Sequence, residues 1–250
     1  MTTKSRPPAP TTNEVRTYYE RPLLDRVSGR YVVAWDTPDG PASIRVHNRV
    51  VDLEGERPSL RSVLGLPRVL ASYLEARRRP LLRRPLPFLN FDAIRHLARL
   101  VPDGAPTRVA EVGAGNSTLW LLARGAHVTT IEHDARWARE LAREAAARGL
   151  AGRLTLHVAE GAAALEALSG LDDATLDLLL VDCKNAHTRR HDCIARGRQK
   201  VRSGGTVCLD NSDHPNNWSA AELMRDRERT RFSGFGPMCA VVTQTSFWQV

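Results

Sequence analysis

The chain has 250 residues, of which 42% are hydrophobic and 26% charged, and it carries a formal net charge of +8. This length and composition indicate a globular protein with a substantial core, and no apolar run reaches the ~20 residues of a membrane span. The polar, Pro-rich start at residues 1–10 lacks the apolar segment of a secretion signal, so we expect a cytoplasmic protein without a membrane partner.

The first third of the chain predicts a small α+β extension ahead of the main domain. Residues 1–20 predict a flexible arm. Alternating apolar residues on either side of the turn at Pro38–Gly40 predict a β-hairpin over residues 31–53. We place the domain boundary at the prolines that end this region, so the extension covers residues 21–87 and the main domain residues 88–250.

Neither the charge nor the cysteines define a partner by themselves. A basic cluster, residues 77–79 and 83–84, ends the helix expected over residues 60–79; it is either a solvated helix end or the rim of a site for an anionic small substrate. The remaining positive charge is spread along the chain, which disfavours a nucleic-acid partner. The four cysteines lack metal-binding spacing and are expected to be buried or incidental thiols: Cys183, Cys193, Cys208 and Cys239.

The main domain alternates between strand-like and helix-like segments with short connections. The expected strands cover residues 107–112, 127–132, 153–158, 176–182 and 206–210, and the expected helices cover residues 88–101, 116–124, 134–148, 161–168 and 188–201. A helix over residues 218–229 and a loop over residues 231–237 follow, and the tail, with its apolar run 239–248, supplies the last two strands as an antiparallel pair. This rhythm predicts an α/β fold with a mostly parallel sheet, an antiparallel last strand, and helices on both faces.

A glycine-rich turn joins the first strand of this domain to its helix. The stretch Glu111–Gly115 is followed by the polar residues 116–118 at the start of an apolar helix. Such a junction presents backbone N–H groups and the positive end of a helix dipole to a ligand. Glu132 ends the next strand, where a ribose-binding carboxylate is expected. A dinucleotide dehydrogenase is disfavoured, because the third glycine expected near Thr118 is absent.

Carboxylates stand at the ends of four predicted strands, and they are Glu111, Glu132, Asp182 and Asp210. Because ligands of parallel sheets bind outside the carboxyl ends of the strands, we expect these four side chains to gather at one rim.

These motifs resemble those of class I S-adenosylmethionine-dependent methyltransferases, over residues 88–250. The closest likeness is to a bacterial branch with the motifs ExGxGxSTLW, EHD and LDNSD, which stand here at residues 111–120, 132–134 and 209–213. Residues 232–247 fit the C-terminal pattern of the same branch. The resemblance implies a Rossmann-like fold and S-adenosylmethionine as cofactor.

The resemblance also implies how the cofactor is held. The backbone of Gly113, Ala114 and Gly115 would approach the methionine and ribose, Glu111 would lie near the methionine amino group, and Glu132 would bind both ribose hydroxyls. Glu160 and Gly161 would lie against the adenine, with Glu160 either an acceptor for the exocyclic amine or only a carboxylate favoured by a helix dipole. The further cofactor-binding residues expected are Asn116, Ser117, His133 and Asp182.

A partial likeness to metal-dependent catechol-type O-methyltransferases implies Mg²⁺ ligated by Asp182, Asp210 and Asn211. The metal would bind a substrate hydroxyl and lower its pKa. The alternative is that the two aspartates line the pocket and orient the substrate without metal. The catechol-type enzymes have a lysine base three residues after the first aspartate, where this chain has Asn185, and Lys184 stands one residue early.

The expected catalytic residues are Asp182, Lys184, His187, Asp210 and His214, with His191 a further candidate base. Histidine is the side chain most easily held near neutral pKa, and these histidines follow the fourth and fifth strands. Methyl transfer from a sulfonium depends mainly on in-line positioning, so a strong base is not required.

We therefore predict a methyltransferase that acts on a small molecule, with oxygen as the favoured acceptor atom. Residues 1–87 would form a substrate-side cap or a homodimer contact. One alternative is an RNA methyltransferase, although the chain lacks both an Asn/Asp-Pro-Pro-Tyr segment and a Pro-Cys nucleophile motif. The other is a non-catalytic protein that keeps the cofactor pocket as a structural or sensory site.

Overall fold

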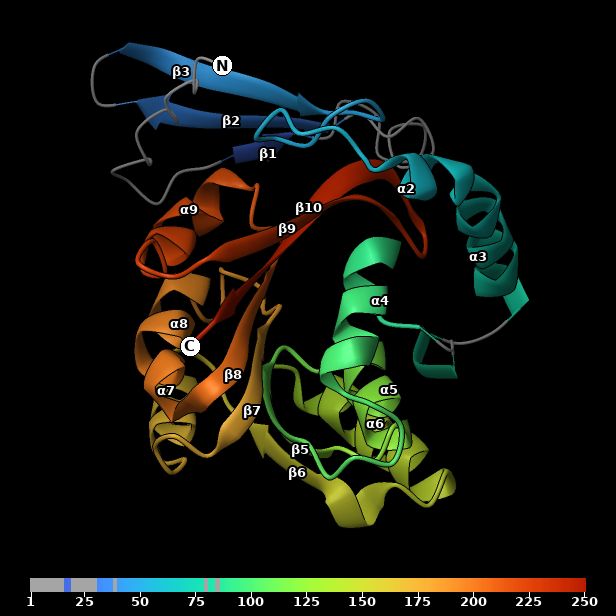
Figure 1. The fold of residues 1–250 in the computed structure, drawn as a ribbon, viewed down its shortest axis with the longest axis vertical. Helices are drawn as coiled ribbons and strands as arrows, with labels where there is room; N and C mark the ends of the chain where they lie inside the picture. Colours follow the sequence, from blue (N-terminus) through green and yellow to red (C-terminus); the bar gives the residue numbers. More distant parts are fainter. Residues whose placement is uncertain (1–15, 19–30, 38–39, 79–80, 84–85) are drawn as a thin grey trace.

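A seven-stranded sheet organises the computed structural model, which describes residues 16–18, 31–37, 40–78, 81–83 and 86–250 (Figure 1). Its strands are β4 (Arg108–Val112), β5 (His127–Glu132), β6 (Leu154–Val158), β7 (Leu176–Val181), β8 (Val201–Asp210), β9 (Arg229–Gly236) and β10 (Cys239–Gln249). They lie in the order β6-β5-β4-β7-β8-β10-β9. The strands β4 to β8 pair in parallel, and β10 runs antiparallel to both of its neighbours. The predicted mostly parallel sheet with an antiparallel last strand is confirmed.

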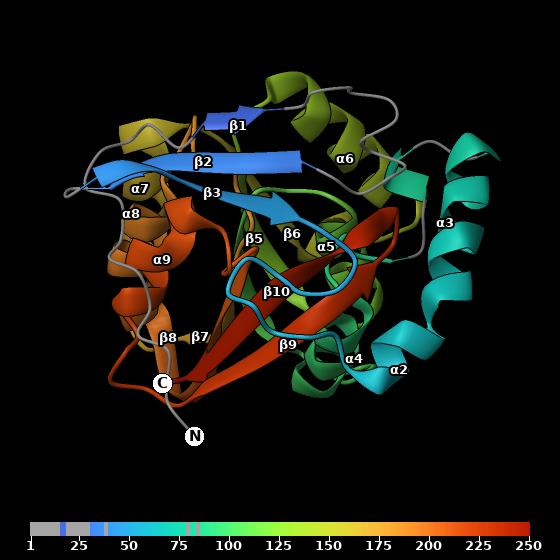
Figure 2. The same cartoon turned by 90° about the horizontal axis from the view of Figure 1, so that it is seen from above.

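Helices cover both faces of this sheet, as predicted. One face carries α4 (Phe91–Leu100), α5 (Asn116–Ala123) and α6 (Ala135–Ala147), and the other carries α7 (Gly161–Ser169), α8 (Arg190–Gly197) and α9 (Pro215–Glu222) (Figure 2). Short 3₁₀ turns, η1 (Leu81–Arg83), η2 (Ala151–Arg153) and η3 (Arg198–Lys200), complete the connections.

The two layers of helices enclose two separate apolar clusters. In β7, Leu178 and Leu180 pack toward α4, α5 and α6, whereas Leu179 and Val181 pack toward α7, α8 and α9. This division follows from the period of two in a strand, which sends successive side chains to opposite faces. A run of apolar residues therefore forms a strand that is buried on both sides.

The N-terminal extension contains a three-stranded antiparallel sheet in the order β1-β2-β3, made of β1 (Arg16–Tyr18), β2 (Tyr31–Thr37) and β3 (Gly40–His47). The predicted hairpin is present, but its second strand ends at His47 rather than Leu53, because the Asn48 side chain accepts hydrogen bonds from the N–H groups of Val50 and Val51 and turns the chain. Residues 16–18 of the expected arm form a strand, and residues 1–15 lie outside the described residues.

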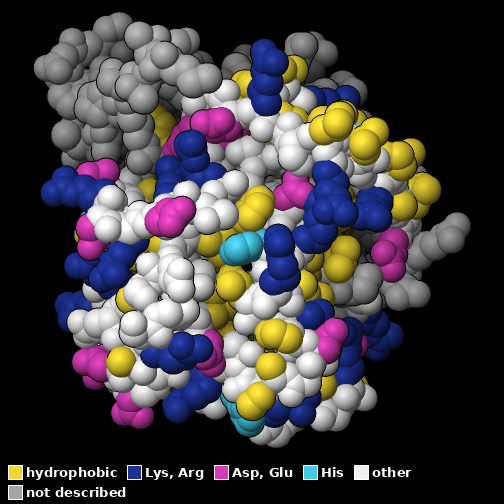
Figure 3. Space-filling model, in the orientation of Figure 1, with side chains coloured by type: hydrophobic (Ala, Val, Ile, Leu, Met, Phe, Trp, Pro, Cys, Tyr) yellow, Lys and Arg dark blue, Asp and Glu magenta, His cyan; other side chains and the backbone are white. Residues whose placement is uncertain are grey.

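The helix predicted over residues 60–79 is divided at Gly65 into α2 (Leu60–Leu64) and α3 (Leu66–Arg78). Its inner face packs on the C-terminal strands: Ser62 is 1% exposed and Val69 is 3% exposed. The outer face of α2 and α3 is apolar and open, with side chains over these helices forming the hydrophobic region at the upper right of Figure 3. Its exposed residues are Leu60, Val63, Leu64, Leu66, Leu70 and Leu74. The cap or homodimer role of this region stays a prediction.

Only part of the predicted basic cluster is described. Arg83 lies 3.3 Å from Glu144 of α6, whereas Arg79 and Arg84 fall outside the described residues. In the described ranges, no helix combines the length and the apolar character needed to cross a bilayer.

Three elements predicted in the C-terminal half differ from the structure in their bounds or their type. The helix expected over residues 188–201 ends at Gly197, and β8 already begins at Val201. The helix expected over residues 218–229 begins at Pro215, where His214 caps it, and ends at Glu222. The loop expected over residues 231–237 is instead strand β9 as far as Gly236.

Candidate functional site

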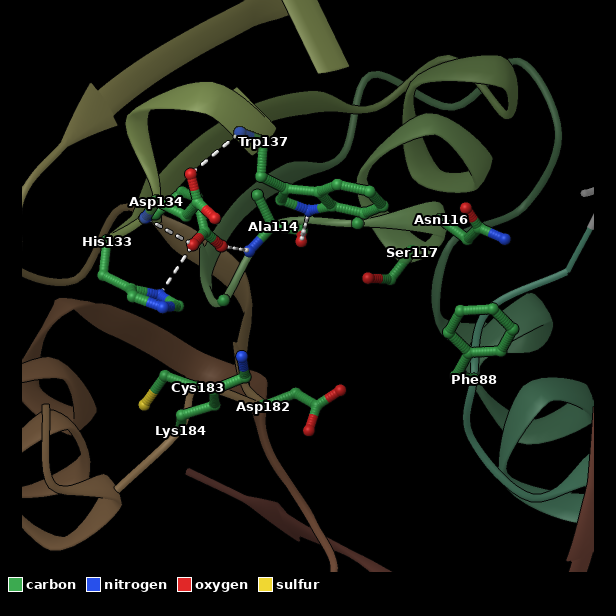
Figure 4. Close-up of a pocket in the computed structure, with 13 residues that line it drawn as sticks. Phe88, Ala114, Asn116, Ser117, His133, Asp134, Trp137, Asp182, Cys183 and Lys184 are labelled. Carbon is green, nitrogen blue, oxygen red and sulfur yellow. Dashed lines mark hydrogen bonds and ion pairs between the residues drawn. The ribbon is translucent and has the colours of Figure 1, made fainter. Parts of the chain in front are cut away.

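A cavity of about 340 Å³ opens at the carboxyl ends of β4, β5 and β7 (Figure 4). This is the size range of small-molecule sites. Its walls combine residues predicted from the sequence with others that were not predicted. The lining residues are Phe88, Gly113, Ala114, Gly115, Asn116, Ser117, Glu132, His133, Asp134, Trp137, Asp182, Cys183 and Lys184.

The glycine turn after β4 has one crowded glycine and one open glycine. Gly113 has a φ of +98°, and a Cβ atom there would come within 2.7 Å of the carbonyl oxygen of Asp182. Its N–H donates to the carbonyl oxygen of Ile131, so the chain passes tightly between β5 and the end of β7. A Cβ atom at Gly115 would meet no described atom within 4 Å. The open side of this turn therefore borders the cavity.

Glu132 holds a buried and well-oriented carboxylate at the end of β5. It is 4% exposed. Its Oε2 accepts a hydrogen bond from the N–H of Ala114 (2.9 Å), and its Oε1 lies near the N–H of Asp134 (2.8 Å) and Nδ1 of His133 (2.7 Å). These donors fix the plane of the carboxylate, which links the glycine turn to the start of α6.

The start of α6 contributes two lining residues that were not predicted. The Asp134 side chain caps this helix by accepting hydrogen bonds from the N–H groups of Arg136 and Trp137. The indole of Trp137 donates to the carbonyl oxygen of Ala114. Figure 4 shows the Trp137 ring over the glycine turn and Phe88 on the far side of Ser117. An aromatic residue in the first turn after an acidic strand end is a signal that could have identified Trp137.

Asp182 projects into the cavity and is paired with a buried arginine. Its Oδ1 lies 2.8 Å from Nη2 of Arg190, and its side chain is 30% exposed. Its second oxygen, Oδ2, accepts no hydrogen bond from the residues that the structure describes. In Figure 4 the carboxylate points into the open space beside Ser117.

The predicted magnesium ligands do not form a magnesium site, which corrects the expectation. The Asp210 carboxylate is 4% exposed and accepts a hydrogen bond from Oγ1 of Thr245 (2.6 Å) rather than facing the cavity. Burial and the nearby Asp182 raise the pKa of Asp210 to about 7. Asn211 has a φ of +46°, and its carbonyl oxygen accepts a hydrogen bond from Asn217. Within the described ranges, no group of acidic, histidine or cysteine side chains is arranged to hold a metal.

Glu111 lies behind the cavity wall rather than on it. It is fully buried, and the hydroxyl groups of Thr118 and Thr130 donate to its Oε2. Its Oε1 has no hydrogen-bond partner among the residues that the structure describes. Burial raises the pKa of Glu111 to about 7, against the hydrogen bonds from Ser117, Thr118 and Thr130. Any influence of Glu111 on a ligand passes through Ser117, which does line the cavity.

The expected adenine-side residues and one candidate base meet beside the cavity. Nδ1 of His187 lies 2.8 Å from Oε2 of Glu160, and the His187 ring stacks on that of His133 with centroids 3.8 Å apart. The N–H of Gly161 donates to the carbonyl oxygen of His187. The loops after β5, β6 and β7 are therefore joined here.

The other candidate bases are not brought together. Lys184 is exposed and lines the cavity. His214 caps α9, and burial lowers its pKa to about 4. His191 has a buried Nδ1 without a partner in the described part of the chain, and it is not among the lining residues. Of the four free cysteines, Cys183 lines the cavity; it, Cys193 and Cys208 are buried, and Cys239 is half-buried, as expected of incidental thiols.

Part of the chain matches a known family of protein domains. Residues 110–212 match a family model described as a methyltransferase domain, which spans the glycine turn and the ends of β5, β7 and β8. A search of curated proteins returned no match for the chain.

Solved structures share the fold. The chain is similar to cofactor-bound Rv0187 from MTB, with 20% identity, a TM-score of 0.54, and coverage of 78% of this chain and 99% of that chain. It is similar to the O-methyltransferase TomG from Streptomyces achromogenes in complex with SAM, with 20% identity, a TM-score of 0.51, and coverage of 74% and 89%. An O-methyltransferase from Bacillus cereus in complex with SAH gives 17% identity, a TM-score of 0.54, and coverage of 75% and 91%. The solved structures show that the chain shares their Rossmann-like fold, and the domain match covers most of the residues that line the cavity.

Proposed function

We propose that the chain uses S-adenosylmethionine to methylate an oxygen atom of a small molecule. The main support for this proposal is the cavity. It is lined by the hydrogen-bonded carboxylate of Glu132, by the open glycine turn and by the start of α5. The methyltransferase-domain match covers these residues. The Streptomyces and Bacillus proteins of the same fold hold SAM and SAH, respectively, which supports the choice of cofactor.

The residues present fit this cofactor. Three donors orient the carboxylate of Glu132, and its Oε2, which accepts one hydrogen bond, retains acceptor capacity for a ribose hydroxyl. The turn at Gly115 leaves room for a ligand to approach the backbone. The first N–H groups of α5, at Asn116 and Ser117, suit the methionine carboxylate. Asn116 also has a buried Oδ1 that no described residue contacts by a hydrogen bond, and this oxygen is an acceptor for an amino group.

The acceptor is proposed to lie beside Asp182 and Lys184. When bound, the cofactor would supply an activated methyl group for the acceptor oxygen and would leave as S-adenosylhomocysteine. Oδ2 of Asp182 accepts the hydrogen bond of the acceptor hydroxyl and then its proton. Lys184, exposed at the wall, attracts an anionic group elsewhere on the substrate. Orientation by these two residues is the main contribution of the chain to the rate.

Calorimetric titration of S-adenosylhomocysteine into the wild type and Glu132→Ala tests the cofactor assignment. We expect saturable binding by the wild type and at least a tenfold loss in Glu132→Ala. Glu140→Ala is the matched control, because Glu140 is on α6 but is exposed, and its ion pair in the described structure is with Arg136. It is expected to bind as the wild type does.

Two results would overturn the proposal. One is the absence of binding by the folded wild type. The other is equal affinity in the wild type and in folded Glu132→Ala. Saturable cofactor binding by a protein that transfers no methyl group to any acceptor would instead favour a non-catalytic, sensory role.

A further inference from the structure

A buried arginine occupies the space between the ends of β7 and β8. The Arg190 side chain is 9% exposed. Its Nη2 donates to Oδ1 of Asp182 (2.8 Å), its Nε to the carbonyl oxygen of Cys183 (2.7 Å), and its Nη1 to the carbonyl oxygen of Asp210. The guanidinium thus binds three oxygen atoms from two neighbouring strand ends with its fixed fork of donors.

The local sequence holds this arginine at the start of α8. The backbone N–H of Arg190 donates to Oδ1 of Asn185 (2.8 Å), and the amide of Asn185 donates in turn to Oδ1 of Asn217 (2.8 Å). Asn217 donates to the carbonyl oxygen of Asn211, just after β8. Two connections and the first turn of a helix therefore fix the position of the guanidinium.

This arrangement leaves no place for a divalent cation between Asp182 and Asp210. A magnesium ion needs several converging oxygen ligands and water in an octahedron. Here one oxygen of Asp182 and the carbonyl oxygen of Asp210 are already bound to a cation, and the Asp210 carboxylate turns toward Thr245. A second cation at this point would also be repelled by the guanidinium at short range.

We infer that Arg190 is the permanent cation of this site and takes the position of a catalytic metal, so that the cofactor and acceptor bind without one. The inference rests on the proposed function. Arg190 is a positioning residue: it orients Asp182 and leaves only Oδ2 for the substrate. The acceptor class is accordingly one that offers a single hydroxyl as a hydrogen-bond donor, with no need for a second, chelating oxygen beside it.

The first experiment measures metal binding directly. Mn²⁺ is titrated into the wild-type complex with S-adenosylhomocysteine and followed by electron paramagnetic resonance, while the affinity for S-adenosylhomocysteine is measured with chelator and with Mg²⁺. We expect no saturable Mn²⁺ binding below millimolar concentration and affinities that agree within twofold. Saturable Mn²⁺ binding in the micromolar range, or a tenfold loss of affinity with chelator, would overturn the inference and leave the cofactor assignment intact. Failure of S-adenosylhomocysteine to bind under any condition would refute the proposed function instead.

Variants separate a positioning role from a structural one. Arg190→Met removes the charge but keeps the apolar stem, so Asp182 and the carbonyl oxygen of Asp210 become free for metal, and we expect Mn²⁺ binding to appear. Arg190→Lys keeps the charge and is expected to exclude Mn²⁺ as the wild type does. Arg189→Met is the matched control, because Arg189 is exposed and makes no side-chain cap of α8. The inference would be contradicted if Arg190→Lys and Arg190→Met bound Mn²⁺ equally well. If Arg190→Met does not fold, the Mn²⁺ titration of the wild type tests the inference by itself.

Discussion

The indole Nε1 of Trp137 donates a hydrogen bond to the carbonyl oxygen of Ala114 at 2.8 Å. This bond joins the first turn of α6 to the glycine turn, two walls of the same cavity. Trp137→Phe removes the donor and keeps an aromatic side chain, although a smaller one. We expect the affinity for S-adenosylhomocysteine, measured by calorimetry, to fall about fivefold, since one such hydrogen bond contributes about 1 kcal/mol.

Trp120→Phe is the control for this measurement. Trp120 lies on α5 against the guanidinium of Arg124 and does not line the cavity. Its replacement should leave the affinity unchanged. A Trp137→Phe variant that binds as tightly as the wild type would show that the indole hydrogen bond does not shape the cavity.

Alanine substitutions at the two glycines of the turn should affect different properties, stability at Gly113 and cofactor affinity at Gly115. Gly113→Ala places a Cβ atom against the carbonyl oxygen of Asp182 in a backbone conformation with positive φ, so the free energy of unfolding should fall by about 3 kcal/mol. Gly115→Ala meets no neighbour and should change the unfolding free energy by no more than about 1 kcal/mol. Its methyl group borders the cavity, so affinity for S-adenosylhomocysteine should weaken several-fold. Urea denaturation and calorimetry together separate the two effects, and a stable Gly113→Ala protein would contradict the first.

The cap of α9 makes stability depend on pH. Nδ1 of His214 accepts a hydrogen bond from the N–H of Asn216, and burial lowers the pKa of His214 to about 4. The unfolded chain takes up this proton near pH 6.5, whereas the folded protein does not. The contribution of His214 is therefore complete above pH 6.5 and is lost as the pH falls toward 4, by roughly 3 kcal/mol.

His214→Asn tests this dependence, because asparagine is also a good helix cap but does not titrate. The free energy of unfolding in urea should match the wild type at pH 7.5 and exceed it at pH 5. The exposed His127, replaced by asparagine, serves as the control and should keep the wild-type difference between the two pH values. A parallel decline in the wild type and His214→Asn would exclude this histidine as the cause.

Asp52 attaches the N-terminal segment to the C-terminal strands. It is 3% exposed, and its Oδ2 accepts hydrogen bonds from Oγ of Ser233 (2.6 Å) and Nε2 of Gln244 (2.8 Å). Asp52→Ala leaves these donors without their acceptor, so the free energy of unfolding should fall by about 3 kcal/mol. Limited proteolysis should then cleave near residues 54–58. Glu56→Ala, which removes only a surface ion pair with Arg231, should resist as the wild type does.

The positions of the strand ends could be predicted because apolar runs, carboxylates and glycines stand at regular spacing. Glu132, the last residue of β5, and Asp182, just after β7, do line the cavity. The orientation of the other carboxylates could not be predicted in this way. Glu111 faces the hydroxyls of Thr118 and Thr130, a contact that depends on how α5 returns over the sheet.

The contacts of Arg190 could not be predicted from the sequence either. It is one of 36 lysines and arginines, and it acquires its place through oxygen atoms on β8 and on the loop after β7. A pattern along one segment carries no information about such a contact. The likeness to catechol-type enzymes therefore suggested a metal where the fold places a guanidinium.

The sequence predicts a loop where the structure has strand β9, for a related reason. Gly234 and Gly236 favour a turn in sequence. In the structure they permit close packing: a Cβ atom at Gly236 would lie 2.5 Å from the carbonyl oxygen of Leu89, and one at Gly234 would collide with Oγ of Ser62. Glycine within a strand here marks the close approach of another segment, by its side chain at Gly234 and by its backbone at Gly236.

The position of β10 between β8 and β9 has a consequence for synthesis of the chain. During translation β9 emerges before the strand that holds it in the sheet, and Leu53 emerges 160 residues before its hydrogen-bond partner Asp213. The hydrogen bonds of the N-terminal segment and of β9 to the sheet therefore remain incomplete until β10 has left the ribosome. Such long-range pairing slows folding and leaves strand edges exposed. Until β10 is synthesised, the nascent chain can therefore bind chaperones or aggregate through these edges.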